Sequence, residues 1–196
     1  MKIATVVSSD SHLDYLARVV DSLDVAAPPD ADDFGFAQFV SMPIDDGPEL
    51  VGIIYDSTLI NPEYSNFGPR LSPKPDLGKF SPDFLNEQGL LLRILILGTR
   101  SEDGTDHGVP RRAAPAGQDV FALSADDVMR IHRGPDGRLR IHYYSQLTSH
   151  VGPASAPLVE AIIGQLEATA EKADLGRLKV LNETLRWQRT IGGLRL

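Results

Sequence analysis

Short runs of apolar residues, separated by polar breaks, cover the first three quarters of the chain. The clearest strands are predicted at Glu49–Asp56 and at Leu90–Leu97, whose near-continuous apolar run suggests burial on both faces. Six or seven strands at this spacing favour a small closed β-barrel, because closure removes exposed sheet edges. The remaining predicted strands are Lys2–Ser8, Phe34–Val40, Asp119–Leu123 and Arg138–Tyr144.

The segment His12–Leu23 is ambiguous, since its apolar residues fit both helical spacing and strand alternation. Between the predicted strands, 61–82 and 99–117 are rich in proline and glycine and predict long irregular loops. A short helix is predicted at Ser81–Glu87, and a tight turn at Gly134–Gly137. Gly52, inside the predicted strand Glu49–Asp56, suggests a bulge or a close backbone approach.

Helical periodicity replaces strand patterning after about residue 150. Ser155 is a plausible cap for a helix with an apolar stripe, and a second helix is predicted after Asp174. The chain is therefore divided into a barrel, 1–147, and a C-terminal helical hairpin, 148–196, which either covers the barrel or presents its stripe to a partner. A short helix capped by Ser124 is also predicted, before the turn at Gly134–Gly137. The stripe residues are Leu158, Val159, Ile162, Ile163 and Leu166, then Leu178, Leu181 and Leu185.

Composition indicates a folded domain, with 42% hydrophobic and 23% charged residues. The sequence has no cysteine, which excludes disulfides, thiolate zinc sites and cysteine nucleophiles. The first residues lack the apolar core and cleavage site of a signal peptide, and no apolar run approaches the length of a membrane span. A cytoplasmic protein without a cofactor is expected.

Charge is unevenly distributed along the chain. The formal net charge is −8, yet residues 1–90 carry 5 basic and 15 acidic side chains (−10), while 91–196 carry 14 and 12 (+2). Residues 175–196 contain five basic residues and one acidic residue, a net charge of +4. This basic tail is either a solvated helix face or a docking surface for an acidic partner or nucleic acid.

Motifs for nucleotide hydrolysis and serine hydrolysis, G-x-x-x-x-G-K-[ST] and G-x-S-x-G, are absent from the sequence. The most metal-like group is His12 with Asp10 and Asp14, but one short cluster lacks the several converging ligands of a metal site. His107, in the second polar loop, and the pair His132 and His142 are interpreted as structural. Paired carboxylates fall in loops or at a helix start, where solvation and capping explain them. The chain is therefore expected not to be an enzyme.

The order of elements resembles the HAS barrel, the small β-barrel shared by HerA-type DNA-translocating ATPases and the N-terminal region of rotary ATP synthase subunits. The resemblance spans about residues 1–145. Its most specific piece is a strand ending in Leu97-Gly98, a loop with Val109-Pro110-Arg111-Arg112, and Pro115-Ala116-Gly117-Gln118-Asp119-Val120-Phe121. Membership would favour a strand over a helix at His12–Leu23.

In those ATPases a large motor domain follows the barrel, whereas only residues 146–196 follow here. The resemblance thus implies a binding or assembly subunit that docks on a HerA-like hexameric DNA translocase or an associated nuclease. The alternative is a nucleic-acid-binding barrel, and a hydrolase that uses His12 ranks last. We expect a protein partner and no membrane. Nucleic-acid contact is possible but indirect, and oligomerisation is possible. The candidate contact residues are Arg111, Arg112, Arg177, Lys179, Arg186 and Arg189.

Overall fold

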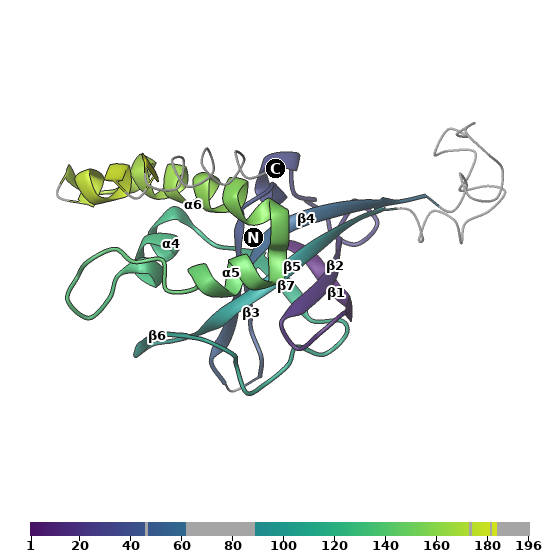
Figure 1. Ribbon diagram of the computed structural model, residues 1–196. Helices are drawn as coiled ribbons and strands as arrows, with labels where there is room; N and C mark the ends of the chain where they lie inside the picture. The colour runs from purple at the N-terminus through teal and green to yellow at the C-terminus, as the bar shows by residue number, and fades with distance from the viewer. Residues whose placement is uncertain (46, 62–88, 173, 181, 184–196) are drawn as a thin grey trace, which may run out of the picture.

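The computed structural model describes residues 1–45, 47–61, 89–172, 174–180 and 182–183. Seven strands form one antiparallel sheet in the order β2-β1-β7-β3-β4-β5-β6, and a further pairing of β2 with β5 closes the first six into a barrel (Figure 1). β6 is the extra strand and pairs with β5. The strands are β1 Lys2–Ser9, β2 Asp14–Val19, β3 Phe39–Met42, β4 Glu49–Ile60, β5 Gly89–Ser101, β6 Gly104–His107 and β7 Asp119–Ala122.

The ambiguous segment at His12–Leu23 contains the strand that closes the barrel. β2 pairs with β1 on one side, where Ala4 faces Val19, and with β5 on the other, where Asp14 faces Leu95. Because both edges of β2 are paired, its backbone groups are satisfied as a strand, and the strand alternative is the correct one. The predicted fold class, a six- to seven-stranded β-barrel followed by helices, is confirmed.

β4 and β5 form the longest strand pair of the barrel, and its pairing contains a bulge at the glycine that the sequence singled out. The register shifts between Val51 and Gly52. A Cβ atom at Gly52 would lie 2.8 Å from Ile94 Cγ2 and 3.0 Å from the Leu95 carbonyl oxygen. The predicted close backbone approach at Gly52 is therefore confirmed, and it is the reason why no side chain fits there.

Helices cover the barrel and share its core. α4 (Ala125–His132), α5 (Tyr144–Val151), the 3-10 turn η2 (Gly152–Ala154) and α6 (Ser155–Thr169) follow the last strand, and α5 lies across β5 (Figure 1). Residues 174–180 are helical again, and Leu178 belongs to the core. The α6 stripe packs into the core instead of facing a partner, because its five apolar side chains, Leu158, Val159, Ile162, Ile163 and Leu166, are at most 1% exposed.

The strand predicted at Arg138–Tyr144 does not form. Leu139 makes only an isolated bridge to Arg133, and Tyr144 begins α5. The backbone of this segment bonds instead to the end of α4 and the turn after it, because the Arg140 amide donates to the His132 carbonyl at 2.9 Å and the Gly134 amide to the Arg138 carbonyl at 3.0 Å. Tyr143 instead buries its ring beneath the helices, at 2% exposure.

The polar loop predicted at 99–117 is shorter than expected. β5 continues to Ser101, and β6 pairs back along it from Gly104 to His107. This hairpin projects beyond the barrel, and its strand β6 is exposed or half-buried. Its side chains are accordingly polar, which is why the sequence resembles a loop.

Smaller predictions had mixed outcomes. Ser124 caps α4 as expected, since its Oγ accepts a hydrogen bond from the Asp127 amide at 3.2 Å. The predicted cap at Ser155 is wrong, because Ser155 is the first residue of α6 and Ala154 stands at the cap position without a side-chain hydrogen bond. The short helix predicted at Ser81–Glu87 lies outside the described residues. The predicted domain boundary at 147/148 falls inside α5. None of the described helices has the length and apolar character needed to cross a membrane.

Candidate partner-binding surface

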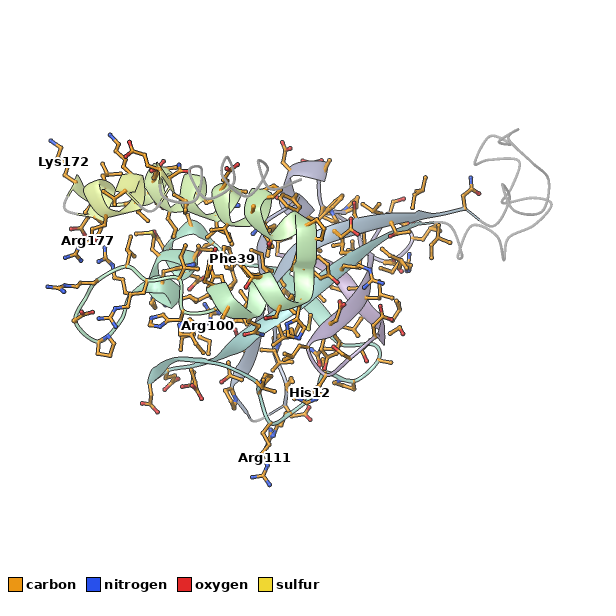
Figure 2. The ribbon with its side chains drawn as sticks, in the orientation of Figure 1. His12, Phe39, Arg100, Arg111, Lys172 and Arg177 are labelled. Atoms are coloured by element: carbon orange, nitrogen blue, oxygen red, sulfur yellow. The ribbon has the colours of Figure 1, made fainter. Side chains whose placement is uncertain are left out.

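The predicted arginine loop is anchored at its base and presents its cations to solvent. Pro110 is buried, and its carbonyl oxygen lies 2.6 Å from Nε2 of His12. Further along, the Ala114 amide donates to the Tyr15 hydroxyl at 3.0 Å. Arg111 and Arg112 lie between these two anchors and are exposed, and Arg111 points away from the barrel (Figure 2). The loop thus offers a positioned pair of cations.

The second predicted group lies on the helical segment 174–180. Its inner face is buried through Asp174 and Leu178, so Arg177 and Lys179 on the other face are exposed. Arg186 and Arg189 lie outside the described residues. Figure 2 shows Arg177 at the left, near the helices, and Arg111 at the bottom, beyond the barrel. The residues predicted together as one contact set therefore do not form one continuous surface.

The fold places a further arginine, Arg133, beside segment 174–180, and the sequence reasoning did not identify it. Arg133, at the end of α4, contacts the carboxylates of Asp174 at 3.5 Å and Glu171 at 3.3 Å. These ion pairs bring the turn at 134–137 against the C-terminal helix. We call residues 128–140 and 170–180 together the basic end. It carries Arg130, Arg133, Arg138, Arg140, Lys172, Arg177 and Lys179 against Asp136, Glu171 and Asp174, that is 7 − 3 = +4.

A cavity of about 780 Å³ lies between the β5–β6 hairpin and α4, and it borders the basic end. Arg100, Arg130 and Arg133 line it together with Glu49 and Glu102, and we call it the arginine pocket. Arg100 is held by Glu49 at 2.8 Å and by Asp127 at 2.9 Å. The volume of the arginine pocket lies in the range of sites that hold small molecules or short peptide segments.

Asp127 pairs with two of the arginines that line the arginine pocket, Arg100 and Arg130. Its pKa lies below the usual aspartate value, first because Ser124 donates a hydrogen bond to it and then because Arg100 and Arg130 are close. The carboxylate therefore stays ionised and keeps Arg100 in place. Arg130 reaches the same carboxylate at 3.4 Å but is 73% exposed, so most of its donor groups face solvent.

The metal-like cluster of the sequence is an ion-pair network. Arg93 reaches the carboxylates of Asp10 at 2.7 Å and Asp14 at 3.1 Å, and the Tyr55 hydroxyl donates to Asp14 at 2.7 Å. Burial is the main cause that raises the pKa of Tyr55 to about 12. The two carboxylates thus share one guanidinium as their partner, and His12 contacts the Pro110 carbonyl.

The histidines that flank the 134–137 turn do not meet. His142 stacks on His107, with ring centroids 4.5 Å apart, while His132 is fully buried. The two ring nitrogens of His132 lie 2.7 Å from the Val128 carbonyl and 2.5 Å from the Tyr143 hydroxyl. Burial lowers the pKa of His132 to about 4. Within the described part of the chain, no three histidine, aspartate or glutamate side chains could hold a metal ion.

A family model described as a domain of unknown function (DUF8166) matches residues 1–195, which is nearly the whole chain. No curated protein matches the sequence.

Proposed function

The chain belongs to the family described as a domain of unknown function (DUF8166), and from its surface chemistry we propose that it is a non-enzymatic binding subunit. In this proposal it docks on a HerA-like hexameric DNA translocase or on an associated nuclease. The observation that carries a docking role is the concentration of exposed cations at the basic end of a chain whose formal net charge is −8. Such charge separation steers association with a complementary partner and fixes its orientation.

The candidate catalytic groups support a binding role because each one has a structural partner. His12 contacts the Pro110 carbonyl, Asp10 and Asp14 pair with Arg93, and His132 lies between Val128 and Tyr143. A general base needs a reactive nitrogen or oxygen within reach of a substrate. These groups instead hold a loop, a strand pair and a helix in position.

The choice of a translocase or nuclease as partner rests on the resemblance to the HAS barrel. The closed six-stranded barrel agrees with that resemblance in architecture. Architecture alone is shared by many unrelated functions, so the partner must be identified by experiment.

The direct test is affinity purification of the tagged chain from native lysate. We expect a HerA-like ATPase or a nuclease to be recovered with the wild-type chain. The variant Arg177→Glu/Lys179→Glu should lose it, whereas Arg111→Glu/Arg112→Glu, an identical charge change in the separate arginine loop, should retain it. Recovery of neither enzyme class with the wild-type chain would contradict the proposal.

Direct nucleic-acid binding is the second candidate function, favoured by the exposed pair Arg111 and Arg112. The two exposed basic groups lie apart, with Arg111 below the barrel and Arg177 near the helices, so a bound strand would have to cross the surface between them to reach both (Figure 2). That path is long, and the chain as a whole is acidic. We therefore rank this function below docking on a protein.

A mobility-shift titration with duplex DNA at low and high salt separates the two functions. Phosphate contacts release counterions, so binding through several arginines would weaken steeply as salt rises, about tenfold or more between low and physiological salt. We expect only weak binding at low salt. Tight, strongly salt-dependent binding that Arg111→Glu/Arg112→Glu abolishes would establish the nucleic-acid function instead.

A further inference from the structure

We propose that the arginine pocket and the basic end form one site, and that an acidic peptide segment of a protein partner binds there. The proposal rests on the docking role but not on which enzyme is the partner. The two regions meet at Arg133, which lines the pocket and also donates to the Gly137 carbonyl at 2.8 Å. A segment that leaves the pocket therefore passes directly onto the 134–140 turn.

The arginines of this site divide into positioned and available groups. Arg100 is 19% exposed, donates a charge-assisted hydrogen bond to Glu49 at 2.8 Å and forms a second ion pair with Asp127 at 2.9 Å. Arg130 is 73% exposed, and Arg138 is 60% exposed with a carboxylate contact at 3.7 Å. These two side chains can turn towards a new carboxylate without losing a close ion pair.

Carboxylates of a peptide suit this arrangement better than a nucleic-acid duplex does. The basic end carries +4, so the rest of the chain carries −8 − 4 = −12. A long polyanion would extend beyond the basic end onto a chain that is acidic overall, where exposed charges interact over about 8 Å at physiological salt. A short acidic segment contacts the basic end alone.

The shape of the site agrees with this choice. A cavity of about 780 Å³ is too small to accept a duplex but holds several side chains of a peptide. Glu49 and Glu102 on its wall, together with the Ser101 and Thr105 hydroxyls, would orient peptide amides while the rim arginines bind carboxylates. Arginine forms planar two-point contacts with carboxylates, which supplies directional recognition as well as attraction.

The test measures binding of a fluorescently labelled oligoglutamate peptide by anisotropy. We expect saturable binding that weakens with salt, and about tenfold weaker binding for Arg130→Glu/Arg138→Glu, a loss of about 1.4 kcal/mol. Both replaced side chains are mostly exposed, so the variant should keep its melting temperature. Arg111→Glu/Arg112→Glu is the matched control, with the same charge change, and should bind as the wild type does.

Three results would overturn the site. The first is that the wild-type chain does not bind the peptide, and the second is that both double variants lose peptide affinity equally. The third is that duplex DNA binds more tightly than the peptide and that replacing Arg130 weakens DNA binding to the same extent. The purification from lysate is independent. If Arg130→Glu/Arg138→Glu still recovers the translocase or nuclease, the site is refuted while the docking role stands. If the peptide binds but no such enzyme is recovered, the site stands without that partner.

Discussion

Replacing Phe39 by alanine is expected to lower the free energy of unfolding by about 3–5 kcal/mol. Phe39 is fully buried on β3, beneath the helices (Figure 2). Its ring makes edge contacts with His132 at 5.2 Å and with Tyr143 at 6.2 Å between centroids. Truncation removes these contacts and leaves a cavity between the barrel and its helical cover. Since a domain of this size has a stability of about 5–15 kcal/mol, the loss is a large share of the total.

Phe36→Ala is the matched control, because the same residue type is removed three positions away in the chain. Phe36 is 48% exposed, so its truncation should cost less than about 1 kcal/mol. Urea unfolding of both variants against the wild type, followed by far-UV circular dichroism, gives the two differences. Equal losses in the two variants would show that the helices do not pack on β3 as described.

The barrel could be predicted because its strands carry local signals. The apolar runs that became β4 and β5 are long and bounded by turn residues, and Gly52 indicated a close approach that the register shift confirms. The segment that became β2 could not be assigned from periodicity, since its strand character depends on pairing with β5, about eighty residues away in the chain. Such pairing is a property of the closed sheet, not of the segment.

The candidate site was harder to predict than the fold. Arg177 and Lys179 were identified because they lie in a basic tail, which composition alone reveals. Arg138 was noted only as a basic residue beside the turn, and Arg130 and Arg133 were not identified. Only the contacts of Arg133 with Glu171 and Asp174 connect the end of α4 to the C-terminal helix. Surface sites assembled from distant segments give no sequence pattern of their own.

Acid is expected to weaken the fold through His132 before it affects the carboxylates. The pKa of this histidine is about 4 in the folded protein, because burial disfavours the charged ring, and about 6.5 in the unfolded chain. Between these values the unfolded state binds more protons, so stability falls as the pH falls from about 6.5 towards 4. From about pH 7 to about pH 5, the expected loss from His132 is about 2 kcal/mol. The pKa of His107 is also lowered by burial, which adds to the slope.

The variant His132→Leu tests this assignment, with His150→Leu as the control on the exposed surface of α5. His132→Leu loses the contacts with Val128 and Tyr143, so it should be less stable than wild type at about pH 7, by about 1–3 kcal/mol. Its stability should then change much less towards about pH 5, because the group that takes up the proton only on unfolding is gone. Urea unfolding at several pH values measures both effects. His150→Leu should keep the wild-type slope. If instead His132→Leu keeps the full slope and His150→Leu loses it, the buried ring is not the group that makes the fold acid-sensitive.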